Sequence, residues 1–148
     1  MTNIFVRNRK DTPFKVSMKA IELSAEIIKV LNREKNIPKY HRYITIQPVI
    51  NKTYELLENI IAANEIYATD DLKLEMKLRY YERAKINIAQ LQDFLLVLEK
   101  SITELKAAKL VNIGRLMSEV SALLTNWKKT FKKALQEVEV DIEDKDLV

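Results

Sequence analysis

The stretch DDLKLEMKLRYYERAKINIAQLQDFLLVLEKSITEL, residues 70–105, decides the fold of this chain. Apolar residues recur in it in steps of four or three, at positions 74, 78, 81, 84, 88, 91, 95, 98, 102 and 105. Because an α-helix turns once every ~3.6 residues, this spacing predicts one long helix with a single apolar stripe. Asp70 or Asp71 is expected to cap its start by accepting from the free backbone N–H groups of the first turn. A stripe of this length must be covered by other helices.

One segment of this helix is apolar on more than one side. Phe94-Leu95-Leu96-Val97-Leu98 is apolar over five consecutive positions, which point nearly all the way round a helix. A helix that is apolar all round is normally buried all round. Leu95 and Leu98 belong to the stripe, so Phe94, Leu96 and Val97 require a second partner. We expect these three residues to contact another copy of the chain.

Composition excludes several classes of protein. The chain has 148 residues, of which 47% are hydrophobic and 31% charged, as expected for one globular domain. One glycine and three prolines exclude turn-rich β folds and glycine-rich phosphate loops, and the absence of cysteine excludes disulfides and thiolate metal sites. No apolar run approaches the ~18 residues of a membrane span. We therefore expect a cytoplasmic protein that has no membrane partner.

Charge is unevenly distributed along the chain. The net charge is +4, but residues 137–148 contain six acidic residues and one lysine, a net −5, which leaves +9 on residues 1–136. A basic body indicates a polyanionic partner, or an acidic tail that competes for the same surface. The expected organisation is a basic N-terminal arm (1–13), a helical body (14–136) and a flexible acidic tail (137–148).

Two further helices are predicted before the long one. The first extends from Ser17, as its cap, to Lys35, and the residue before Pro38 ends the helical region. Its predicted buried face is Met18, Ile21, Ala25, Ile28 and Leu31, widened by Leu23, Ile27 and Val30. The second helix covers residues 39–68 and contains Pro48. We favour one helix kinked at Pro48; the alternative is a helix that begins there with proline in its first turn.

The last helix follows the long one after a short turn. The long helix is expected to end between Lys106 and Asn112, and Asn112 is expected to cap the last helix with Gly114 in its first turn. The residues predicted to face its core are Ile113, Leu116, Met117, Val120, Leu123, Leu124, Trp127 and Phe131. Four helices joined by short turns predict an all-α, up-down-up-down four-helix bundle.

The residues available for chemistry argue against an enzyme. One histidine and no cysteine leave no nucleophile–base pair except through His41, and zinc ligands and Glu-x-x-His di-iron motifs are missing. We therefore expect no catalysis, no cofactor and no metal.

Three groups of basic residues are candidates for nucleic-acid binding, although each group is also compatible with a solvated helix face. The first group lies on the long helix: Lys73, Lys77, Arg79, Arg83 and Lys85. The second lies between the first two helices: Arg33, Lys39, His41 and Arg42. The third lies late in the last helix: Lys128, Lys129, Lys132 and Lys133.

Two regions carry a family resemblance. These are IPKYHRY (37–43), which leads into LLENIIAAN (56–64), and EVSALLTNW (119–127). Together they resemble the accessory variability determinant family, the helical-bundle accessory proteins of diversity-generating retroelements. That family is similar to the four-helix proteins encoded in intervening sequences of bacterial ribosomal RNA genes. The resemblance covers about residues 15–133, and it departs at Thr125-Asn126-Trp127, where the family often has glycine before the tryptophan.

The resemblance implies a specific function. Family members form a barrel-like homopentamer with a basic surface, bind the retroelement reverse transcriptase, and associate with its template RNA or cDNA. They have no activity of their own and support mutagenic reverse transcription. The alternative is a structural helical-bundle module that binds only protein and has no nucleic-acid role.

Overall fold

The computed structural model describes residues 12–33 and 35–146. Within these ranges every regular element is helical, and there is no strand. The elements are α2 (Thr12–Leu31), the 3₁₀-helix η1 (Lys39–His41), the π-helix η2 (Arg42–Ile46), α3 (Gln47–Glu65), α4 (Asp71–Ser101) and α5 (Ala107–Asp146). The predicted all-α class with four main helices is therefore confirmed.

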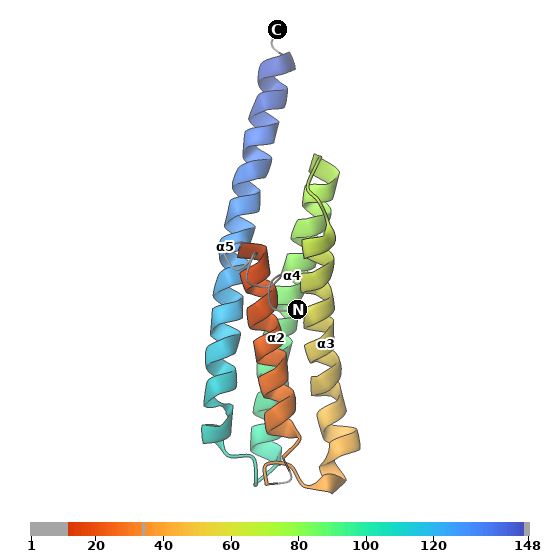
Figure 1. Cartoon of the computed structure of the whole chain (residues 1–148), viewed down its shortest axis with the longest axis vertical. Coiled ribbons are helices and arrows are strands. Elements are labelled where there is room, and N and C mark those ends of the chain that lie inside the picture. The colour runs from red at the N-terminus through yellow and green to blue at the C-terminus, as the bar shows by residue number, and fades with distance from the viewer. Residues whose placement is uncertain (1–11, 34, 147–148) are drawn as a thin grey trace, which may run out of the picture.

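The four α-helices lie side by side (Figure 1). α2 packs against α3 and α5, and α4 packs against the same two helices. α3 and α5 thus cover the two flanks of α4. At its C-terminal end, drawn in blue in Figure 1, α5 continues beyond the other helices.

The apolar stripe of α4 forms much of the core, as predicted. Every stripe position is buried except Leu78, which is half-buried. Asp70 caps the helix, because its Oδ1 accepts from the backbone N–H of Lys73 at 2.9 Å. Each buried leucine or isoleucine contributes about 1.5–3 kcal/mol relative to exposure in water.

α4 ends earlier than predicted. Its last residue is Ser101, and Ile102 has an extended backbone with φ −109° and ψ 108°. Ile102 and Leu105 remain buried in the following turn, where the N–H of Leu105 donates to the carbonyl of Ile102 at 3.1 Å. The apolar spacing continues past the helix because these two side chains fix the turn against the core.

α5 begins earlier than predicted, at Ala107, so Asn112 does not cap it. Asn112 instead accepts from the guanidinium of Arg115 within the helix. Gly114 lies about two turns inside α5, and a Cβ atom there would meet nothing within 4 Å, so no close helix approach explains this glycine.

The two ends of the chain were predicted to be a basic arm (1–13) and an acidic tail (137–148). The backbone of residues 137–146, the expected acidic tail, is helical and continues α5, and no glycine or proline after Gly114 interrupts it. Residues 1–11 of the expected basic arm lie outside the described residues, and Thr12 and Pro13 already belong to α2.

The buried face of α2 is rotated from the predicted one. α2 starts five residues before Ser17, which is therefore not a cap; its Oγ accepts from the side-chain amide of Asn64. Of the predicted face, Leu31 is buried and Ile28 half-buried, whereas the remaining three are exposed: Met18, Ile21 and Ala25. The buried row is Val16, Ala20, Leu23, Ile27, Val30 and Leu31, which includes the three residues predicted to widen the face. The earlier start adds Val16 to one continuous stripe, and that stripe faces the core.

The region around Pro48 combines the two expected alternatives. Helical turns start at Lys39, but they are of 3₁₀ and π type, and the α-helix itself begins at Gln47 with Pro48 in its first turn. Proline is tolerated there because the first-turn N–H groups have no partner within the helix.

An aromatic contact joins α4 to α5. The ring centroids of Tyr81 and Trp127 lie 4.2 Å apart, and the two ring planes meet at 66°. The Tyr81 hydroxyl donates to Oδ1 of Asn64 on α3 at 2.6 Å, and burial raises the pKa of this phenol. Asn64 also donates to Ser17 of α2, so these hydrogen bonds and the ring contact with Trp127 together link all four α-helices.

We expect Tyr81→Phe to destabilise the fold by about 1–3 kcal/mol, because it removes a buried donor to Asn64. Tyr80→Phe is the matched control, since Tyr80 is the adjacent, half-buried tyrosine. Urea unfolding followed by circular dichroism measures both variants. An unchanged midpoint for Tyr81→Phe would show that its hydroxyl has no net role in stability.

Candidate nucleic-acid interface

Lys77 is not an exposed binding residue, contrary to the prediction. Its side chain is buried, with Nζ 4.7 Å from the centre of the Trp127 ring and 3.1 Å from the carbonyl oxygen of Ile66, to which it donates. Burial lowers the pKa of Lys77 because it penalises the charged form. The lysine is held inside the bundle by a cation–π contact and a backbone acceptor, so it is not available to phosphate.

The remaining basic residues of α4 differ in exposure, and Arg83 is among the exposed ones. Lys85 is half-buried and its Nζ donates to Oγ1 of Thr125 at 2.9 Å. The guanidinium of Arg83 lies 5.4 Å from the centre of the Tyr80 ring. Lys73 and Arg79 are exposed. Only part of the predicted group therefore faces solvent.

The basic group of α5 is also only partly available. Lys128 forms an ion pair with Glu82 of α4 at 3.2 Å. Lys129 and Lys133 are exposed, whereas the side chain of Lys132 lies outside the described residues. These four lysines follow one another along α5, and none of them lines a cavity described for this structure.

The second predicted group lies at the end of the bundle where α2 ends and α5 begins. There a cavity of about 360 Å³ is lined by Arg33, Lys35, Asn36 and Lys109. Asn36 is buried, and its side-chain amide donates to the carbonyl of Val30 at 2.8 Å, which fixes the turn after α2. Three cations from two distant parts of the chain thus line one cavity.

Sequence reasoning named Arg33 but missed Lys35 and Lys109. Lys35 could have been identified as a candidate from the sequence, because it lies two residues after Arg33. Lys109 lies more than 70 residues away in the sequence, and it reaches the cavity only because α4 ends at Ser101 and the chain turns back by Ala107.

Exposed aromatic side chains lie on the helical turns η1 and η2, which follow three of the cavity residues in the chain. Tyr40 and Tyr43 are exposed, with 87% of Tyr43 accessible, and the ring of Tyr40 lies 4.2 Å from that of half-buried His41. Arg42 ties these turns to the end of α2, because its Nη2 donates to the carbonyl of Asn32 at 3.1 Å. Tyr43 lies in the π-helix η2, a rare geometry that is frequent at functional sites.

We call this surface the corner cluster. It comprises Arg33, Lys35, Lys39, Tyr40, His41, Arg42, Tyr43 and Lys109. Among the side chains that the structure describes, no acidic residue forms an ion pair with Arg33, Lys35 or Lys109 of this cluster. Glu34 is not among the described residues. Cations of this kind bind phosphates, and exposed aromatic rings stack on unpaired bases.

Residues 94–98, the segment predicted to contact another copy, have side chains on both the buried and the exposed side of α4. Leu95 and Leu98 are buried in the core, and Phe94 is half-buried against it. Leu96 and Val97 are 48% and 58% exposed. They leave an apolar surface on the outside of α4.

Two properties of the described residues bear on partners. Among the side chains that the structure describes, no group of three histidine, cysteine or acidic residues could hold a metal ion. None of the described helices is both long and apolar enough to cross a bilayer.

Comparison with protein families, curated proteins and solved structures found no match to this chain. The family resemblance therefore depends on the sequence motifs alone.

A matched pair of lysine substitutions tests the corner cluster. We expect Lys109→Met to weaken binding of a labelled oligouridine and to reduce the slope of log affinity against log salt by about 0.7, the value for one lost single-strand phosphate contact. Lys77→Met should leave both quantities unchanged, because its ammonium is buried. Fluorescence anisotropy at several KCl concentrations measures both. Equal losses in the two variants, with both folded by circular dichroism, would contradict the assignment.

Proposed function

We propose that this chain is a non-catalytic accessory protein of a diversity-generating retroelement. In this proposal it binds the reverse transcriptase and the template RNA or cDNA, and supports mutagenic reverse transcription in the cytoplasm. The sequence motifs at 37–64 and 119–127 support the family, and the all-helical architecture is compatible with it.

The corner cluster is the observation that carries the nucleic-acid role. Its cations would contact phosphates, which provides affinity without sequence specificity. Its exposed tyrosines would stack on bases, which are available only in single strands. This combination suits a template RNA or a newly made cDNA, with the sequence choice left to the polymerase.

The proposal includes an assembly of several copies. The four helices would form an up-down-up-down bundle, and five bundles would form a barrel-like ring through Phe94, Leu96 and Val97. The exposed side chains of Leu96 and Val97 support a protein contact at this surface. A ring would cover them and place several corner clusters in one particle.

Tyrosine substitutions distinguish single-strand binding from simple charge attraction. We expect Tyr43→Ser to weaken binding of single-stranded RNA by about 1–3 kcal/mol, the range for one stacked base, and to leave duplex RNA binding unchanged. Tyr67→Ser is the control, because Tyr67 is also exposed but follows α3 at the other end of the bundle. Anisotropy titrations with both RNAs measure the effect. If the unaltered chain binds no RNA, the protein-only module becomes the better explanation.

A charged substitution tests the copy-to-copy contact. We expect Leu96→Asp to lower the mass measured by light scattering from five subunits to one, with helicity unchanged, because the carboxylate would be buried without a partner. Ile86→Asp is the control on the same helix, since Ile86 is similarly exposed. A chain that is monomeric before substitution, or a Leu96→Asp variant of unchanged mass, would remove this interface.

A further inference from the structure

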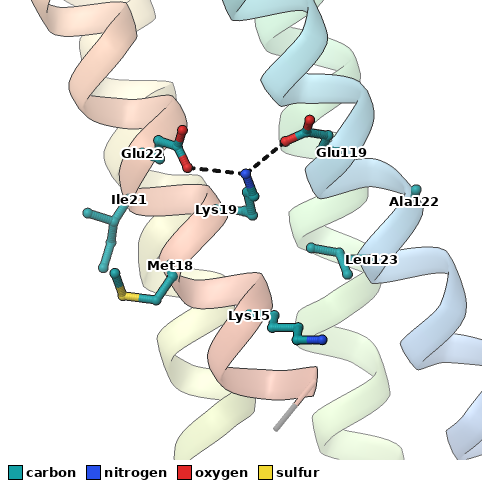
Figure 2. Close-up of a pocket in the computed structure, with 8 residues that line it drawn as sticks. All are labelled: Lys15, Met18, Lys19, Ile21, Glu22, Glu119, Ala122 and Leu123. Atoms are coloured by element: carbon teal, nitrogen blue, oxygen red, sulfur yellow. Dashed lines mark ion pairs between the residues drawn. The ribbon is translucent and has the colours of Figure 1, made fainter. Parts of the chain in front are cut away.

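An apolar groove lies between α2 and α5, away from the corner cluster. It encloses about 710 Å³ and is drawn in Figure 2. Met18 and Ile21 of α2 and Ala122 and Leu123 of α5 supply its apolar lining. Ile21 is 48% exposed, so this face of α2 is left without a partner in the described bundle.

Three of the four charged residues that line the groove, Lys19, Glu22 and Glu119, form ion pairs, whereas the fourth, Lys15, is exposed. Nζ of Lys19 lies 3.3 Å from Glu22 and 3.1 Å from Glu119, and Arg115 pairs with Glu119 at 2.7 Å (Figure 2 shows the first two pairs). The hydrogen bond with Glu119 raises the pKa of Lys19 and lowers that of Glu119. Because most of these charges are paired, an occupant of the groove would be recognised mainly by apolar contact.

The chain itself supplies an apolar segment close to this groove. Residues 1–11 immediately precede α2 and lie outside the described residues; they contain Ile4-Phe5-Val6. The groove residues of α2 lie about 5–14 Å along the helix from Thr12, at ~1.5 Å per residue. The six residue-to-residue steps from Phe5 to Asp11 can span up to about 20 Å when extended. The segment is long enough to fold back along α2 and place its apolar residues in the groove.

We propose that Ile4-Phe5-Val6 docks into the groove between α2 and α5. A short tether holds the segment at an effective concentration on the order of millimolar, so it outcompetes a second copy of the chain present at micromolar concentration. Docking covers Met18 and Ile21, which the bundle leaves exposed. This inference does not depend on the retroelement role and would hold for either function of the bundle.

Engineered cysteines test the docking, because the natural chain has none. The test pair is Arg7→Cys with Ile21→Cys, which preserves the apolar triplet. The control pair is Arg7→Cys with Ile61→Cys. Ile61 is 52% exposed on α3, and the hydrogen bond between Asn64 and Ser17 places that part of α3 beside the start of α2. The two target positions are thus matched in residue type and exposure but lie on different helices.

We expect the test pair to form an intrachain disulfide on the order of tenfold faster than the control pair at micromolar protein. Thiol alkylation followed by intact mass analysis measures the rates. Adding Ile4→Ser, Phe5→Ser and Val6→Ser to the test pair should remove the difference in rate, because the segment then has no apolar side chains to dock. The fold should persist, since the described core does not include these three residues. Equal rates for the two pairs would overturn the proposal. A disulfide between chains whose rate rises with protein concentration would also overturn it, and would assign the groove to a second copy.

Discussion

The packing of Tyr81 against Trp127 fixes how α4 is oriented in the bundle. Tyr81 is fully buried and bonds to Asn64 on α3, while Trp127 comes from α5. Lys77, one turn before Tyr81, lies over the same tryptophan ring and bonds to the backbone after α3. With α4 held on both flanks, its stripe must face inward along its length, and this orientation places Leu96 and Val97 outside. The surface offered to a partner is therefore set by contacts four turns away.

The sequence predicted α4 well because its evidence was local. The spacing of apolar residues and the Asp70 cap both depend on neighbours within a few turns. Lys77 was misjudged because the acceptor that makes its burial possible, the carbonyl of Ile66, belongs to the loop after α3. The face of α2 was misjudged for another reason. Apolar residues of α2 form two overlapping rows, and periodicity alone does not select one when the start of the helix is misplaced.

Cations on a helix flank and cations at a bundle end behave differently. On α4 and α5 some basic side chains have partners on the neighbouring helix, such as Thr125 for Lys85 and Glu82 for Lys128. At the bundle end, the turn after α2 and the start of α5 converge, and their cations line a concave surface. Sequence reasoning identified Arg33 because it lies near His41 and Arg42. It could not identify Lys109, because that residue depends on where α4 ends.

The position of the outer apolar surface bears on how the proposed assembly would bind nucleic acid. Leu96 and Val97 lie within about two turns of Ser101, at the end of the bundle that also carries the corner cluster. Copies joined through this surface in a closed ring are related by rotation, so their corner clusters would all lie at the same end of the ring. One strand could then contact several clusters in succession. Because affinity rises with each phosphate neutralised, weak sites that share a strand would together bind it tightly.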